Sequence, residues 1–206
     1  MSEGDFFDTD AKRAVAASVQ LAEAKTSAEV VVAVRPRSGQ YGVLAYHFGL
    51  ALAAITVGYL LLVPAVYSVE AIALDGVLAF LLGALLAANF DTLRRGLARR
   101  STLDANVNAA ARAAFFDLGI SRTTGRTGVL VYVSLFERRA LALCDIGIDA
   151  HRLGASFQAA SLDLDHAIQR RNLGDFLGAL ESLGAVLGAL YPRSSDDVNE
   201  LSDEVQ

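Results

Sequence analysis

VLAYHFGLALAAITVGYLLLVPAVY (residues 43–67) and AIALDGVLAFLLGALLAANF (residues 71–90) are the two runs that decide the fold of this chain. The first run contains no formally charged residue, and the second contains only Asp75. Each run matches the ~20 residues with which an α-helix crosses the ~30 Å hydrocarbon core of a bilayer. Pro64, which cannot continue a helix, and Glu70, which resists lipid, favour a turn between the runs. The pattern therefore predicts a transmembrane hairpin of two helices.

The composition agrees with a division into a lipid part and a water part. Hydrophobic residues make up 53% of the chain and charged residues 20%, which is apolar for a soluble globule. No Lys or Arg lies between Arg37 and Arg94. The alternative is a buried helix pair in a soluble protein, and it would need an enclosing shell because both runs are hydrophobic on every side. The remaining chain is too short to build that shell.

The basic residues that flank the runs predict the orientation of the hairpin. Cytoplasmic loops of membrane proteins carry an excess of Lys and Arg. The turn between the runs has no basic residue. The flanks carry these arginines: Arg35, Arg37, Arg94, Arg95, Arg99 and Arg100. We therefore expect a multi-pass protein of the cell (inner) membrane, with both termini in the cytoplasm and the turn outside.

Two polar residues and several small residues lie within the runs. His47 is near the inner end of the first run and Asp75 is near the outer end of the second, so both are interpreted as interfacial residues whose polar groups reach water. Small residues recur four apart, which lets helix backbones approach closely. Packing inside the hairpin explains this spacing, and a homo-oligomer contact is the alternative. The pairs are Gly49/Ala53, Ala54/Gly58, Gly83/Ala87 and Ala84/Ala88.

Outside the hairpin, the first half of the chain predicts a helix and then a strand. Asp8 or Thr9 can cap the helix. Glu29–Arg35 (EVVVAVR) has the continuous, β-branched apolar character of a central strand that is covered on both faces. After the hairpin, Ser101 with Asp104 resembles a capping box at the start of another helix.

The second half predicts two strands followed by helices. Residues 129–135 (VLVYVSL) and 140–146 (ALALCDI) indicate an antiparallel pair joined by a short turn. From about Ala150 the pattern is helical, with a broad apolar stripe and an adjacent stripe of glycines, where close packing against a sheet would use them. These glycines are Gly174, Gly178, Gly184 and Gly188. Helices on a small mixed sheet make an α/β fold, a three-layer α/β/α sandwich.

The hairpin is expected to interrupt this sandwich. Residues 1–40 form its first part, residues 41–91 the transmembrane hairpin, residues 92–193 the second part, and residues 194–206 an acidic, flexible tail. Folding then requires the strand before the hairpin to pair with strands that follow the hairpin.

Charge and cysteine content argue against several classes of function. The formal net charge of −5 disfavours a nucleic-acid surface, which needs a basic face. The single cysteine, Cys144, excludes an intrachain disulfide and a Cys-based zinc site, and its apolar surroundings indicate a buried, inert thiol. The amino terminus begins acidic and polar and does not resemble a secretory signal.

Three carboxylates form the candidate metal site. Asp145 and Asp149 flank Gly147 where a strand is expected to end, and Glu137 lies at the opposite end of that strand. Carboxylates around a tight glycine turn can bind a hard cation such as Ca²⁺ through oxygen. In the alternative interpretation, Asp145 caps the following helix and Asp149 is solvated.

Other patterns give no catalytic arrangement. Residues 123–128 (TTGRTG) have the glycines, hydroxyls and arginine of a phosphate-binding loop, but they run into a strand and lack the Walker pattern, so a plain turn is favoured. His166 lies beside Asp163 and Asp165, which are interpreted as helix-start residues. No histidine is placed by its spacing to activate a Ser, Thr or Cys nucleophile.

Segments of the chain together resemble the TPM-domain family, whose named members include thylakoid-lumen phosphatase-like proteins and photosystem II repair factors. They are TSAEVVVAVR (residues 26–35), ISRTTGRTGVLVYVSLFERRALALCDIGID (residues 120–149) and NELSDEV (residues 199–205), with GVLVYVS-x-x-ER the most specific part. The chain looks closest to the bacterial branch that carries a membrane hairpin inside the domain. The resemblance implies an α/β/α sandwich. Many members have a GYG-like turn after the last strand, and here only the central glycine, Gly147, is kept.

The resemblance also bears on function, because members are described as acid phosphatases, as calcium binders, or as accessory factors without chemistry. We expect a membrane-tethered, non-enzymatic accessory or interaction module whose partners are the lipid bilayer and other membrane proteins. The alternatives are a divalent-cation-dependent, acid-phosphatase-like enzyme and a calcium-binding sensor. The number of carboxylates that converge beside Gly147 separates these hypotheses.

Overall fold

The computed structural model describes residues 8–194, 200, 201 and 205 of the chain. It divides into two compact units. The first consists of Met1–Ser38 and Asp104–Gln206, and the second is Gly39–Leu103. The hairpin unit therefore extends further at its C-terminal side than the predicted range of 41–91.

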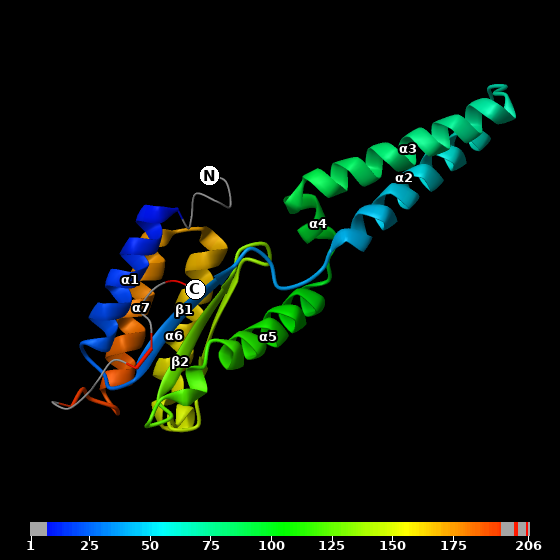
Figure 1. The fold of residues 1–206 in the computed structure, drawn as a ribbon. Coiled ribbons are helices and arrows are strands. Elements are labelled where there is room, and N and C mark those ends of the chain that lie inside the picture. The colour runs from blue at the N-terminus through cyan, green and yellow to red at the C-terminus, as the bar shows by residue number, and fades with distance from the viewer. Residues whose placement is uncertain (1–7, 195–199, 202–204, 206) are drawn as a thin grey trace. The chain divides into compact units, whose positions relative to one another are not determined.

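A mixed sheet forms the centre of the first unit (Figure 1). Its strands are β1 (Glu29–Arg35), β2 (Gly128–Ser134) and β3 (Arg139–Cys144), in the order β1-β2-β3. β1 pairs with β2 in parallel, from Glu29 opposite Gly128 to Arg35 opposite Ser134, and β2 pairs with β3 in antiparallel. The structure thus confirms that the strand before the hairpin pairs with a strand that follows it.

Helices cover both faces of this sheet. α1 (Thr9–Glu23), α6 (Ala150–Arg170) and α7 (Leu173–Gly188) pack on one face, and α5 (Arg100–Asp117) packs on the other. Asp8 caps α1, since its side chain accepts a hydrogen bond from the backbone N–H of Ala11. The predicted three-layer α/β/α sandwich is confirmed.

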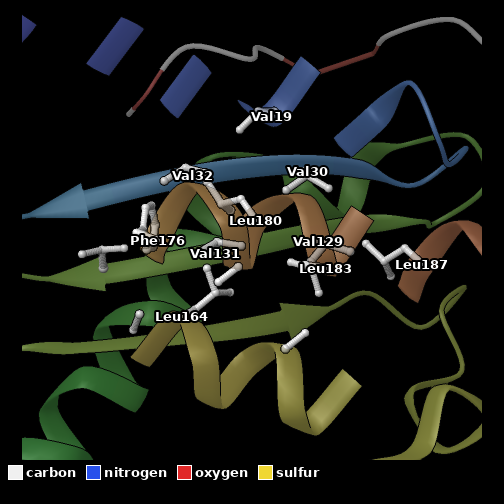
Figure 2. Close-up of a cluster of buried hydrophobic side chains, with 14 of the residues drawn as sticks. Val19, Val30, Val32, Val129, Val131, Leu164, Phe176, Leu180, Leu183 and Leu187 are labelled. Atoms are coloured by element: carbon white, nitrogen blue, oxygen red, sulfur yellow. The ribbon is translucent and has the colours of Figure 1, made fainter. Parts of the chain in front are cut away.

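The period-2 pattern of the strands divides the core between the two faces. In β2, every residue is buried, and alternate side chains enter opposite layers. Figure 2 shows the layer in which valines of β1 and β2 meet side chains of α1, α6 and α7. The labelled members are Val19, Val30, Val32, Val129, Val131, Leu164, Phe176, Leu180, Leu183 and Leu187.

The second unit is a helical hairpin. α2 (Gly42–Leu62) and α3 (Val69–Asn89) run side by side, and both are long and apolar enough to cross a membrane (Figure 1). α2 ends at Leu62 rather than at residue 67, and the side chain of Ser68 caps α3. The turn therefore covers residues 63–68, close to the region of Pro64 and Glu70 in which the sequence predicts it. A further short helix, α4 (Asp91–Leu97), which the sequence did not predict, follows α3.

Small residues bring the hairpin helices together. A Cβ atom on Gly49 would lie 2.6 Å from the carbonyl oxygen of Phe80, and one on Gly83 would lie 2.9 Å from the Cα atom of Gly49. Gly58, by contrast, has open space around it. Packing inside the hairpin therefore explains the pairs that begin at Gly49 and Gly83, whereas Gly58 takes no part in it.

Two expectations about helices are wrong. α5 begins at Arg100, so Ser101 and Asp104 lie inside the helix and form no capping box; the carboxylate of Asp104 binds a strand residue, Arg139, instead. The glycines of α7 do not pack against the sheet. A Cβ atom on Gly184 would lie 2.5 Å from the Cα atom of Ala22, so this glycine allows α7 to approach α1.

The predicted acidic tail, residues 194–206, lies mostly outside the described residues. The carboxylate of Glu200 accepts hydrogen bonds from the backbone N–H of Thr124, at 2.9 Å, and from its hydroxyl, at 3.1 Å. Leu201 packs against the layer between the sheet and α5. These described residues of the tail are therefore in contact with the domain.

Candidate functional site

The carboxylates predicted as metal ligands have separate partners. The buried Asp145 carboxylate accepts hydrogen bonds from the Nε and Nη2 atoms of Arg126 at 2.6 and 2.9 Å. Asp149 accepts from the backbone N–H groups of His151 and Arg152, and Glu137 lies at the other end of β3. Over residues 8–194, 200, 201 and 205, no three His, Cys, Asp or Glu side chains converge as a metal site would require.

The alternative role given to Asp145 is wrong, whereas Asp149 is exposed to solvent as that interpretation expects. Asp149, rather than Asp145, is the N-cap of α6. Asp145 binds the TTGRTG loop, which no single-sequence pattern links to it. Gly147 is required for close packing, because a Cβ atom there would lie 2.3 Å from the carbonyl oxygen of Gly125. The turn at Gly147 therefore packs directly against the TTGRTG loop.

The pairing with Arg126 determines the charge of Asp145. Burial raises the pKa of the Asp145 carboxyl, but hydrogen bonds from the guanidinium and from the backbone N–H of Ile146 outweigh burial and lower the pKa below its usual value. The same ion pair raises the pKa of Arg126. Both groups are charged at neutral pH, and the arginine of the candidate phosphate-binding loop is committed to this carboxylate.

A second polar cluster lies where the parallel strands β1 and β2 end. The buried carboxylate of Glu137 accepts a hydrogen bond of 2.9 Å from the backbone N–H of Ser38 and a short one from the hydroxyl of Ser134. The Ser38 hydroxyl donates to the Ser134 hydroxyl at 2.7 Å, and the Tyr132 hydroxyl lies 2.9 Å from the Ser38 oxygen.

The direction of these hydrogen bonds follows from the number of protons. Each serine hydroxyl has one hydrogen, so Ser38 donates to Ser134, Ser134 donates to Glu137, and Tyr132 must be the donor to Ser38. Burial raises the pKa of the Tyr132 hydroxyl, and the charge of Glu137 adds to that effect, so Tyr132 keeps its proton. The donors form one chain that ends on the Glu137 carboxylate.

An arginine fork adjoins this cluster at the start of β3. Arg139 donates from Nε and Nη2 to one Asp104 oxygen, at 2.8 and 2.6 Å, and from Nη1 to Asp165 at 2.7 Å. The other Asp165 oxygen accepts from the backbone N–H of Ala140 at 2.9 Å. Arg139 therefore joins α5 to α6 across the sheet edge, and Asp165 is a partner of β3 rather than the predicted helix-start residue.

We name these residues the junction cluster: Ser38, Asp104, Tyr132, Ser134, Glu137, Arg139 and Asp165. Ser38 is the last residue of the segment of the first unit that precedes the hairpin, and Asp104 is the first residue of the segment that follows it. Both of these residues are thus bound by side chains from residues 134–139. This range contains the turn between β2 and β3 and the strand residues on either side of the turn.

The junction cluster was only partly predictable. Ser134 and Glu137 belong to the GVLVYVS-x-x-ER segment, and Glu137 was a candidate ligand because of its charge. Ser38 and Asp104 have no local pattern that relates them to this turn, since their partners lie 99 and 35 positions away.

Cys144 is a free cysteine of intermediate exposure. Burial raises the pKa of its thiol to about 12, so the thiolate required of a nucleophile is scarce at neutral pH. This agrees with the interpretation of Cys144 as an inert thiol. The carboxylates described above have structural roles, because they bind arginines, a helix end or the chain segments beside the hairpin.

Comparison with known proteins shows a likeness in fold. No model of a known protein family matches the chain, and no curated protein matches it. Among solved structures, it is similar to the NMR structure of the BA42 protein from the psychrophilic bacterium Bizionia argentinensis, with a TM-score of 0.57 and 15% sequence identity over 97% of this chain and 94% of that chain. At this identity, the likeness concerns the fold alone.

Proposed function

We propose that this chain is a membrane-tethered accessory module with a TPM-like cytoplasmic domain, which assists the assembly or maintenance of other membrane proteins without catalysing a reaction. It is a multi-pass protein of the cell (inner) membrane, with both termini in the cytoplasm. The arginines on both flanks of the hairpin support this orientation. The length and apolar character of α2 and α3 support insertion in the bilayer.

The observation that carries this proposal is the junction cluster. A domain attached by a flexible linker would need no fixed contacts where the chain leaves it. Here Glu137 holds Ser38 and Arg139 holds Asp104, so the domain binds its own chain at both points that lead to the hairpin. We interpret this double attachment as a means of presenting the domain surface to proteins in the same membrane.

The chemistry of the described carboxylates supports a non-enzymatic role. General acid–base or metal-assisted catalysis needs groups that are available to substrate or cation. Asp145 is bound by Arg126, Asp149 caps α6, and Asp165 is bound by Arg139 and Ala140.

Affinity purification of the full chain from detergent-solubilised membranes tests the proposal. We expect the chain to enrich the same membrane proteins reproducibly, and the double variant Glu137→Ala/Arg139→Ala to enrich them less because the segments beside the hairpin are released. The matched control is Asp10→Ala/Arg13→Ala, which removes an ion pair from the exposed surface of α1. Absence of any reproducible membrane partner would contradict the proposal.

A hydrolysis assay separates the accessory role from the phosphatase alternative. The detergent-purified full chain is incubated with phosphomonoesters, with and without Ca²⁺ or Mg²⁺. We expect no hydrolysis above that of a sample prepared from cells without the protein. Metal-dependent hydrolysis that is lost in Asp145→Asn would establish the enzyme instead.

A further inference from the structure

Asp75 lies in an unusual position for a carboxylate. It is on the exposed surface of α3, beside Leu74 and in line with Leu78 and Leu82, and these leucines are 59%, 53% and 54% exposed. The next residue, Gly76, is buried against Val57 of α2 and therefore marks the inner side of the helix. Asp75 thus belongs to an apolar outer face of the hairpin and not to the contact between α2 and α3.

The depth of Asp75 follows from the geometry of α3. Glu70 is an exposed charged residue in the first turn, and from Glu70 to Asn89 the helix rises ~28 Å, close to the ~30 Å of a hydrocarbon core. Asp75 comes five residues after Glu70, so it lies ~7.5 Å further along the helix. The aspartate side chain has a single methylene group, too short to span that distance to water. The interpretation of Asp75 as an interfacial residue therefore does not suit this hairpin.

The hairpin offers no partner to this carboxylate. No described residue makes a hydrogen bond or an ion pair with Asp75. The sequence has no Lys or Arg between Arg37 and Arg94, so neither this hairpin nor a second copy of it can supply a cation at that depth. Ionisable residues within membrane spans pair with one another or line a path, because an isolated charge in lipid is costly.

We propose that Asp75 is the contact point for a partner protein, namely a membrane-spanning helix that carries a lysine or an arginine at the same depth. Asp75 pairs with this cation, and the leucines in line with it pack against the apolar part of the partner helix. This inference rests on the proposed accessory function and names the chemistry of the partner. It also explains why the outer face of α3 keeps a carboxylate among leucines.

Photo-crosslinking in native membranes tests the pairing. Benzoylphenylalanine replaces Leu78 of the full chain, one turn from Asp75 on the same face, and in the control it replaces Ile55, an exposed residue of α2. We expect the Leu78 probe to form an adduct whose peptide, identified by mass spectrometry, is an apolar span with a Lys or Arg. Asp75→Asn and Asp75→Leu should each reduce this adduct at least tenfold without changing the products of the Ile55 probe.

Three results would overturn the inference: no adduct from the Leu78 probe, an adduct that persists in both Asp75 variants, or a peptide without a basic residue, including a second copy of this chain. Co-purification of the tagged variants separates its failure from that of the proposed function. If Asp75→Leu still co-purifies membrane proteins in full yield, the accessory role stands and the Asp75 pairing is wrong. A charge swap would establish the pairing directly. In it, Asp75→Lys is combined with a partner whose Lys or Arg is replaced by Asp, and the adduct should return.

Discussion

The carboxylate of Glu137 accepts a hydrogen bond of 2.9 Å from the backbone N–H of Ser38, although 99 positions of sequence separate the two residues. The contact attaches the segment that follows β1 to the turn between β2 and β3. It therefore ties the last residue before the hairpin unit to the strands that follow that unit. The double attachment of the domain depends on this contact and on the Arg139 fork.

Glu137→Ala should release this segment. The change leaves the partly buried Ser38 N–H and the buried Ser134 hydroxyl without their acceptor, which costs about 1–3 kcal/mol in the free energy of unfolding. Urea unfolding of the full chain in detergent, followed by circular dichroism, measures the loss. Hydrogen–deuterium exchange should rise first in the peptide that contains Ser38. Asp10→Ala is the control, and equal stability of the two variants would contradict this role.

Removal of the Arg139 fork should loosen α5 and α6 together. Arg139→Leu leaves the carboxylate of Asp165 without its cation, and we expect a loss of about 1–2 kcal/mol, moderated because Arg139 is partly exposed. Arg139→Lys keeps the charge but cannot bind both aspartates as a planar fork, so its stability should lie between those of Arg139→Leu and the parent chain. Faster exchange confined to α5, with α6 unchanged, would show that Asp165 does not depend on Arg139.

Gly184 and Gly178 provide a matched pair on α7. Gly184→Ala places a Cβ atom 2.5 Å from the Cα atom of Ala22, so α1 and α7 must separate, at a cost of about 1–3 kcal/mol. Gly178 has open space, and Gly178→Ala should stabilise the helix by up to about 1 kcal/mol. Thermal unfolding of both variants tests this contrast. Similar effects on Tm would contradict the close approach of α1.

The ion pair between Asp145 and Arg126 predicts a pH dependence of stability. Because the pKa of Asp145 is lowered in the folded state, the pair contributes stability that is fully present above the unfolded pKa and is lost as the pH falls through the folded pKa. Asp145→Asn should therefore be less stable than the parent chain at neutral pH, and the difference should shrink in acid. Unfolding measured between neutral and acidic pH checks the trend. A difference that stays constant with pH would argue against the pairing.

The sequence predicts those elements whose signal is local and long. β1 was predicted with its observed bounds because Glu29–Arg35 is almost continuously β-branched, and the hairpin because two long runs lack charge. The expected central place of Glu29–Arg35 is wrong, because β1 lies at the edge of the sheet and β2 at its centre. The short helix α4 was missed because seven residues carry too little periodicity to reveal a helix.

The roles of the carboxylates could not be predicted from local pattern. An aspartate near a helix start satisfies the same rule whether it caps the helix or binds a distant arginine. Asp104 and Asp165 have their partner 35 and 26 positions away, and Asp145 has its partner 19 positions away. These pairings arise from the order of the strands, so Asp104 was wrongly predicted as part of a capping box and Asp145 as a helix cap.

Labelling of cysteines from outside intact cells tests the central claim, that lipid surrounds α2 and α3 and that both termini lie inside. The chain carries Cys144→Ala and one new cysteine, either Ala65→Cys in the turn of the hairpin or Thr124→Cys in the domain. A membrane-impermeant maleimide should label position 65 in intact cells and position 124 only after lysis, with the protein in the membrane fraction. Labelling of position 65 only after lysis, or recovery of the full chain in the soluble fraction without detergent, would contradict the account.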